Sequence, residues 1–186
     1  MTIENDNFTA LFRELISISH SLPKACVMAD LEWKRLESGT GEVSSMTDGA
    51  RKRTVTAVCG GESLTATLFP VERLRRRETE SFDGVTDIRA EEPEDIVFDA
   101  EAIRAFVVTV GDLNPIHGGE RPIVPGCQLL RTVRGMLADS DISRVYMRFE
   151  RPVFAGEPVR FEAASDGTGV LYANGVKKAS VSYAKI

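Results

Sequence analysis

The chain of 186 residues is long enough for one domain, or for two small units that share a core. Hydrophobic residues make up 42% and charged residues 27%, which is typical of a folded protein and excludes global disorder. The net charge of −5 argues against a nucleic-acid surface, because phosphate binding needs a basic face. The chain has neither a basic-then-apolar leader nor a long apolar run, so we expect a cytoplasmic location without a membrane span.

Three cysteines, Cys26, Cys59 and Cys127, are widely spaced and odd in number. No CxxC pair and no Cys/His cluster accompanies them, so the sequence predicts neither a disulfide framework nor a zinc site. We therefore expect three reduced, mostly buried thiols. No metal and no cofactor is predicted.

The first part of the chain predicts a helix followed by antiparallel strands. Apolar residues recur at close to helical spacing over residues 8–19, as on one face of an amphipathic helix. Alternating patterns then predict three strands, at residues 25–37, 53–58 and 63–69. In the first strand we expect one buried side, formed by Val27, Ala29, Leu31 and Trp33. Residues 38–49 are rich in Gly, Ser and Thr and are interpreted as a loop, so that the segment forms a three-stranded meander.

Residues 76–93 are acidic, contain Gly and Pro, and are interpreted as a linker to a second segment at 94–186. This second segment predicts a short strand, two helices and then four strands. The expected elements cover residues 96–98, 100–108, 127–137, 144–150, 159–163, 169–173 and 178–184. Asp99 is predicted to cap the first of these helices, and Asn174-Gly175 to form the last hairpin turn.

The two segments share an order of predicted elements, a helix and then strands. A shift of 118 residues without a gap places Leu11-Phe12-Arg13 on Leu129-Leu130-Arg131, and Val27 on Val145. Helix and first strand stay in step at this shift. The pattern therefore predicts that residues 1–75 are a truncated copy of the second scaffold, without a site of their own.

Residues 111–117, GDLNPIH, carry the strongest functional signal. Asp112 and His117 are five residues apart, and the Asn-Pro between them forces a turn in place of a regular helix. Such a turn can direct a carboxylate and an imidazole into one pocket, where they form a proton-transfer pair near neutral pH. The alternative is that Asp112 and Asn114 only cap a turn around a structural histidine.

A second element follows at residues 122–127, PIVPGC. Gly126 is placed at the start of a helix, where backbone N–H groups lack an intrahelical acceptor and the helix dipole favours negative charge. Donors of this kind suit an enolate or thioester oxygen. The residue pattern therefore predicts Asp112, His117 and Gly126 as the catalytic groups.

The motif GDLNPIH with Phe106 upstream, and the stretch FERPVFAGEPVRFE at 149–162, resemble the MaoC-like (R)-specific enoyl-CoA hydratases. The resemblance covers residues 92–186. It implies an α+β hotdog fold, in which an antiparallel sheet wraps a long helix. It also implies a hydro-lyase that interconverts a 3-hydroxyacyl thioester and its 2-enoyl form. By this resemblance Asp112 and His117 are the catalytic pair, and Asn114 supports the turn that orients them. The resemblance also implies that Asn114, Cys127 and Gln128 are the substrate-binding neighbours of the pair.

The loop after His117, HGGERPIVPG, is similar instead to that of the 3-hydroxyacyl-ACP dehydratases, whose His and Gly have the same separation. Those enzymes carry a Glu on the helix five residues after the Gly, where this chain has Arg131. The mixture leaves both coenzyme A and acyl carrier protein open as carriers of the acyl thioester substrate.

The resemblance and the repeat together imply a double hotdog in one chain. Its N-terminal half would wall the acyl channel, with Gln128, Thr132 and the first helix along it. The alternative is one hotdog with an N-terminal extension, acting as a homodimer or in a hetero-oligomer of hotdog subunits. Two other functions stay open, an acyl thioesterase of this fold and a catalytically idle acyl-binding or partner subunit. None of these interpretations involves nucleic acid or a membrane.

Overall fold

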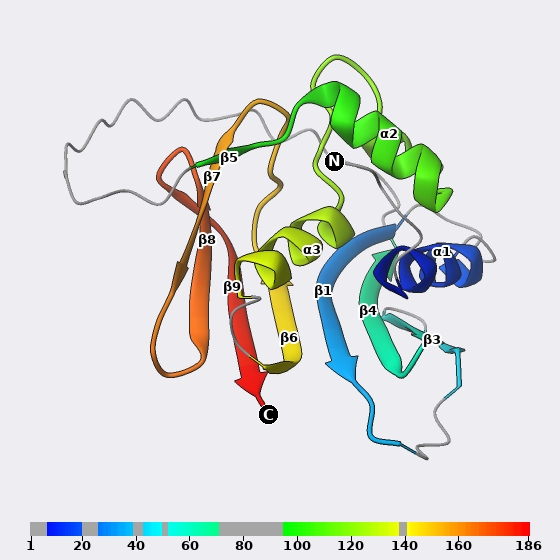
Figure 1. Ribbon diagram of the computed structural model, residues 1–186. Coiled ribbons are helices and arrows are strands. Elements are labelled where there is room, and N and C mark those ends of the chain that lie inside the picture. Colours follow the sequence, from blue (N-terminus) through cyan, green and yellow to red (C-terminus); the bar gives the residue numbers. More distant parts are fainter. Residues whose placement is uncertain (1–6, 20–25, 39–42, 50–51, 71–94, 138–140) are drawn as a thin grey trace.

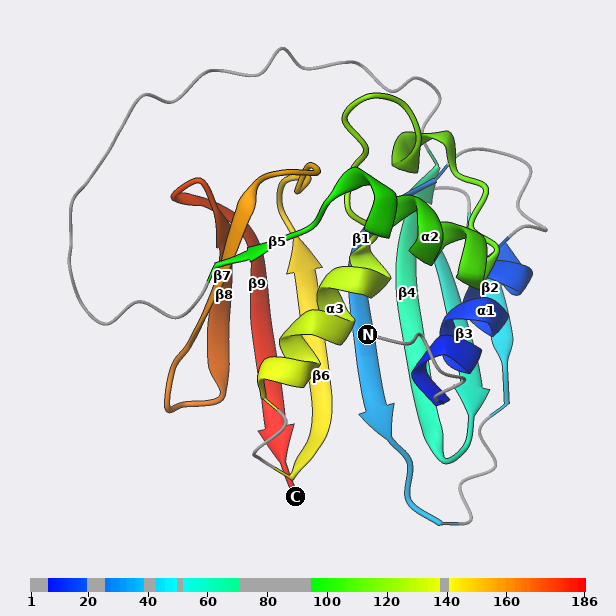
Figure 2. The same ribbon diagram turned by 45° about the horizontal axis from the view of Figure 1, so that its top comes forward.

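The computed structural model describes residues 7–19, 26–38, 43–49, 52–70, 95–137 and 141–186. The linker expected at 76–93 lies outside these described residues. Within them, nine antiparallel strands form one continuous sheet, and the three α-helices lie on one face of it (Figures 1 and 2). None of these helices is long and apolar enough to cross a membrane.

The elements agree closely with the predicted order. The helices are α1 (Asn7–Ser19), α2 (Ala100–Val110) and α3 (Gly126–Met136), with a 3₁₀ turn η1 (Pro115–His117) before α3. The strands are β1 (Cys26–Arg35), β2 (Ser45–Asp48), β3 (Arg53–Cys59), β4 (Glu62–Pro70), β5 (Ile96–Val97), β6 (Ile142–Phe149), β7 (Pro158–Ala163), β8 (Thr168–Ala173) and β9 (Val176–Lys185). Their order across the sheet is β2-β3-β4-β1-β6-β9-β8-β7-β5.

The strands of the second segment curve around α3. This helix contacts β1 and β6 in the middle of the sheet, and its buried residues are Cys127, Leu129, Leu130 and Val133. An apolar stripe at this spacing is what a helix needs to pack on a sheet. The α+β hotdog prediction, an antiparallel sheet wrapped around a central helix, is confirmed.

The first segment forms the other end of the same sheet. Strand β1 pairs with β4 on one side and with β6 on the other, which places Leu31 opposite Met147 and Trp33 opposite Val145. Helix α1 covers β3 and β4. Buried side chains from both segments belong to one hydrophobic cluster. The first segment is therefore part of the core on which the second segment depends.

Three details of the first segment differ from the prediction. Residues 45–48, expected in a loop, form the edge strand β2, which pairs with β3. All four residues are exposed, so this strand lacks the buried face from which strands are recognised in a sequence. Strand β4 lies between β3 and β1, so the segment is not a meander in chain order. The β1 register shifts between Met28 and Asp30, and this bulge leaves Val27 40% exposed instead of buried.

Helix α1 also supports the end of α2. The Arg13 Nε–H donates to the Thr109 carbonyl at 2.9 Å. The rings of Phe12 and Phe106 meet edge to face with their centroids 6.0 Å apart. Thr109 lies in the last turn of α2, so the first segment holds the helix end from which the 111–117 motif departs.

Candidate active site

The GDLNPIH motif begins where α2 ends. Gly111 adopts a left-handed conformation with φ of 76°, which costs a glycine nothing and ends the helix. The Gly111 N–H donates to the Val108 carbonyl at 3.3 Å, and the Asp112 N–H donates to the Val107 carbonyl at 2.9 Å. The closing turn of α2 therefore sets the direction in which Asp112 leaves the helix.

Asp112 and Asn114 each use one side-chain oxygen to build the turn. Oδ1 of Asp112 accepts from the Asn114 N–H at 2.9 Å, and Oδ1 of Asn114 accepts from the Ile116 N–H at 3.3 Å. Pro115 then opens η1, where its missing N–H is no loss. Asn114 therefore orients the motif, while the second oxygen of Asp112 faces His117.

The turn brings the predicted pair together. Oδ2 of Asp112 lies 3.3 Å from Nε2 of His117. On the far side of the ring, Nδ1 lies 2.7 Å from the Ile123 carbonyl oxygen. A carbonyl can only accept, so Nδ1 carries a proton, and in the neutral ring the lone pair is on Nε2. The basic atom of His117 thus points at the carboxylate.

A lone pair and a carboxylate oxygen cannot bond each other without a shared proton. The contact is satisfied when the ring is protonated, or when a water bridges the two atoms from the side and donates one hydrogen to each. The His117 and Asp112 side chains are 8% and 15% exposed, so little bulk water screens them. The arrangement can hold a hydroxyl and transfer its proton.

The first turn of α3 is packed tightly against the junction of β1 and β6. The Gly126 N–H donates to no partner among the described residues. A Cβ at this position would lie 2.9 Å from the Phe149 ring and 3.0 Å from Sδ of Met28, too close for either. Glycine therefore allows the helix to start here, with a free donor beside side chains from both segments.

Cys127 is a buried residue in the first turn of α3. The side chain is 4% exposed. Burial raises the pKa of the Cys127 thiol, and the negative charge of nearby Asp112 raises that pKa further. A raised pKa keeps the thiol protonated near neutral pH, so Cys127 is a poor nucleophile.

We expect alkylation of Cys127 to be more than about tenfold slower than that of Cys26 and Cys59, because its thiol is both buried and protonated. Iodoacetamide labelling of the native protein at mildly alkaline pH, followed by peptide mass spectrometry, gives the three rates. Labelling in denaturant is the control, where the rates should converge. Rapid labelling of native Cys127 would contradict its burial.

Gln128 presents an acceptor without a donor. Its Oε1 atom is buried and has no hydrogen-bond partner among the described residues. A buried polar atom left in this state costs about 1–3 kcal/mol, which a donor on a bound molecule would recover. The position, in the same turn as Gly126 and Cys127, agrees with the predicted binding role, which stays a prediction.

Sequence reasoning missed the groups that contact the Nδ1 side of the His117 ring or support that contact. The Ile123 carbonyl is a backbone atom, and no residue type marks it. Glu157 and Lys178, each 8% exposed, bond to the backbone of the segment that pairs with Ile123. The sequence pattern does not mark Lys178 as buried, because Lys178 and the next residue, Ala179, are both buried in β9 and so break the alternation of a strand.

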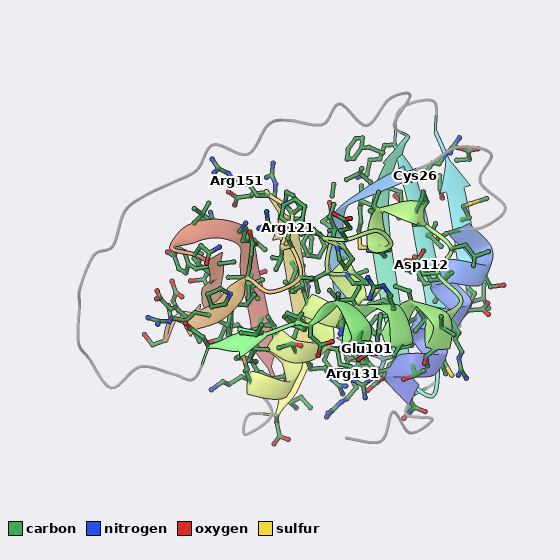
Figure 3. The ribbon with its side chains drawn as sticks, turned by 90° about the horizontal axis from the view of Figure 1, so that it is seen from above. Cys26, Glu101, Asp112, Arg121, Arg131 and Arg151 are labelled. Carbon is green, nitrogen blue, oxygen red and sulfur yellow. The ribbon has the colours of Figure 1, made fainter. Side chains whose placement is uncertain are left out.

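Gly126 lies where the two segments meet, beside Met28 of β1 and Phe149 of β6. In Figure 3, Asp112 and Cys26 both lie on the side of the molecule that holds α1. Arg121 lies towards the strands of the second segment. The chain between Asp112 and Arg121 therefore crosses the end of the sheet above the β1–β6 junction.

No family model and no curated protein sequence matches this chain. A MaoC-like dehydratase from Phytophthora capsici is similar in structure, with a TM-score of 0.52, 14% identity, and coverage of 88% of this chain and 73% of that one. The peroxisomal multifunctional enzyme type 2 from Drosophila melanogaster is similar with a TM-score of 0.50 and 14% identity, over 98% of this chain and 42% of that one. An acyl-ACP thioesterase from Bacteroides thetaiotaomicron has a TM-score of 0.49 and 10% identity, over 90% of this chain and 79% of that one.

At such identities the likeness shows a common fold. The chain spans less than half the length of the Drosophila enzyme. Folds of this kind host several chemistries, so the activity has to be argued from the site.

Proposed function

We propose that this protein is a hydro-lyase that interconverts a 3-hydroxyacyl thioester and its 2-enoyl form. The observation that carries the proposal is the 3.3 Å contact between Asp112 Oδ2 and His117 Nε2, with Nδ1 held by a carbonyl. General acid–base catalysis requires a carboxylate and an imidazole within hydrogen-bond reach of the proton they transfer, and this pair has that arrangement. The hotdog fold, which the chain has in common with a MaoC-like dehydratase, favours an acyl thioester as the substrate.

In the dehydration direction, Nε2 of His117 removes a proton from the α-carbon. The electron pair moves onto the thioester carbonyl as an enolate, whose oxygen accepts from the N–H of Gly126 and of Cys127. When the electrons return, the double bond forms and the bond from C3 to the hydroxyl breaks. The imidazolium gives its proton to the departing hydroxyl, which leaves as water, so atoms and charge balance.

Asp112 has a separate part in this cycle. Its Oδ2 accepts a hydrogen bond from the substrate hydroxyl in one direction and from the attacking water in the other. The same oxygen stabilises the imidazolium, because the two groups lie 3.3 Å apart in a shielded site. Its Oδ1 stays on the Asn114 N–H and keeps the carboxylate in place.

The test is an activity panel of 2-enoyl and 3-hydroxyacyl thioesters, each carried by coenzyme A and by acyl carrier protein, with Asp112→Asn as the control. Loss of enoyl absorbance without release of free thiol is the expected result, and the better substrate identifies the carrier. Release of thiol with unchanged enoyl absorbance would replace the proposal by a thioesterase. Binding of the thioesters with neither change would leave an idle acyl-binding protein.

A further inference from the structure

A buried ion pair is bonded to the backbone segment that pairs with Ile123, whose carbonyl contacts His117. Glu157 and Lys178 are each 8% exposed, and Lys178 Nζ lies 3.0 Å from Glu157 Oε2. Charged side chains are rarely buried to this degree unless they are paired. Neither residue takes part in the chemistry proposed above.

Both charged groups fasten the connection between β6 and β7 to the sheet. Glu157 Oε2 accepts from the Phe154 N–H at 3.1 Å, and Lys178 Nζ donates to the Pro152 carbonyl at 3.0 Å. The Lys178 carbonyl accepts from two more N–H groups, at 2.8 Å and 3.1 Å, at the beginning of the same connection. Since β9 is an interior strand, Lys178 is a rigid anchor for this connection.

The connection is bonded in turn to the backbone around Ile123. Residues 122–124 and 153–155 are joined by a β-bridge between Ile123 and Phe154 and by two hydrogen bonds. These run from the Val124 N–H to the Val153 carbonyl at 2.8 Å, and from the Ala155 N–H to the Pro122 carbonyl at 2.9 Å. A shift of 153–155 would therefore move the Ile123 carbonyl, which accepts from His117 Nδ1 at 2.7 Å.

Arg121 ties the loop after His117 to the same carboxylate. Its guanidinium lies 3.3 Å from Glu157 Oε1 and 4.9 Å from the centre of the Phe154 ring. Because Arg121 is more than half exposed, this contact contributes little by itself. The contact instead fixes the position of the loop. Arg121 on one side of Ile123, and the Phe154 backbone that pairs with Ile123, are both bonded to Glu157.

We propose that Glu157 and Lys178 are positioning residues, which hold the Ile123 carbonyl where it keeps Nδ1 of His117 protonated and Nε2 directed at Asp112. The inference rests on the proposed function, because it takes His117 as the base. A buried ion pair is seldom more stabilising than apolar side chains of the same size. Stability alone therefore does not explain two charges here, whereas a requirement for fixed backbone geometry does.

The test compares two ion pairs that join the same parts of the fold. Glu157→Gln and Lys178→Met alter the buried pair. Glu150→Gln and Lys177→Met alter its exposed neighbour, in which Lys177 Nζ lies 2.7 Å from Glu150 Oε1. With the best thioester from the panel, the buried-pair variants should lose about tenfold or more in kcat with little change in KM, because a misplaced base slows chemistry more than binding. The exposed-pair variants should retain wild-type rates.

A second readout does not depend on activity. The chain has two histidines, so imidazole nitrogen NMR in a His20→Gln background reports His117 alone. The wild-type and exposed-pair proteins should show a slowly exchanging Nδ1–H, and the buried-pair variants should lose it. If a single variant fails to fold, the double variant Glu157→Gln with Lys178→Met, which leaves no unpaired buried charge, takes its place.

Each result has one meaning. An intact Nδ1–H signal and wild-type kcat in folded buried-pair variants would reduce the pair to a stabilising contact and overturn the inference. An inactive wild-type protein on every thioester would overturn the proposed function instead. In that case the Nδ1–H signal would still decide whether the pair orients the ring.

Discussion

Asp112→Asn should lower kcat for hydration of a 2-enoyl thioester by about 10²–10⁴-fold, and His117→Ala by at least as much, because each removes half of a proton-transfer pair. The asparagine side chain has the shape of the aspartate but cannot hold a negative charge against an imidazolium. Its amide oxygen can still accept from the Asn114 N–H, so the turn should persist. The loss is therefore expected in rate and not in folding.

The double variant distinguishes a pair from two separate residues. If Asp112 and His117 act as one unit across their 3.3 Å contact, removing both should cost little more than removing His117 alone. The control is His20→Gln, which changes the other histidine of the chain and should leave kcat unchanged. Near-full activity in both single variants would rule out this pair as the catalytic centre, and multiplied losses would show independent roles.

The contact between Asp112 and His117 could be predicted from the sequence because the turn that brings the two residues together is local. Gly111 ends a helix, Asp112 and Asn114 cap the next backbone groups, and Pro115 prevents the helix from continuing. Each of these is an intrinsic preference of one residue type. Together they bring His117 to the carboxylate, while the orientation of its ring also depends on the Ile123 carbonyl.

The surroundings of the pair could not be predicted in this way. The Ile123 carbonyl becomes a partner of His117 only through the bridge to Phe154. Met28 reaches Gly126 from the first segment, because β1 happens to pair with β6. Contacts of this kind depend on strand order and register, which side-chain periodicity does not encode.

The predicted repeat fits the structure in its helices better than in its strands. The shift of 118 residues places the buried Leu11 and Leu129 on each other in α1 and α3. In β1 and β6 the same shift matches exposed Val27 with buried Val145, whereas Leu31 matches Val145 if the second segment is four residues shorter before its strand. An ungapped comparison cannot see such a deletion. The double hotdog with a truncated N-terminal half stays a prediction.

Trp33 lies where the two segments are joined. It is fully buried, and its backbone is opposite Leu64 of β4 on one side and Val145 of β6 on the other. The Arg134 guanidinium of α3 stacks 4.1 Å from the centre of its ring. Arg134 also pairs with Glu62 at 3.2 Å, so a helix of the second segment is held on the strands of the first.

Trp33→Ala should therefore destabilise the whole protein by about 3–5 kcal/mol, the usual cost of removing a large buried aromatic side chain. Urea unfolding followed by circular dichroism measures the change. Lys34→Ala is the matched control, since Lys34 is the next residue in β1 and its side chain is exposed; we expect a change within about 0.5 kcal/mol.

Trp33→Phe refines the same prediction. The indole N–H of Trp33 is buried without a partner among the described residues, an arrangement that costs about 1–3 kcal/mol. Phenylalanine removes that donor while it retains much of the ring, so Trp33→Phe should lower the free energy of unfolding clearly less than Trp33→Ala.

Trp33 is the single tryptophan, so its fluorescence reports the junction in the wild-type protein. Because the sheet and core are continuous through the junction, fluorescence and circular dichroism should change together. Two separate transitions would mean that the first segment is an independent unit, and it would then not be a fixed wall for the site at Gly126.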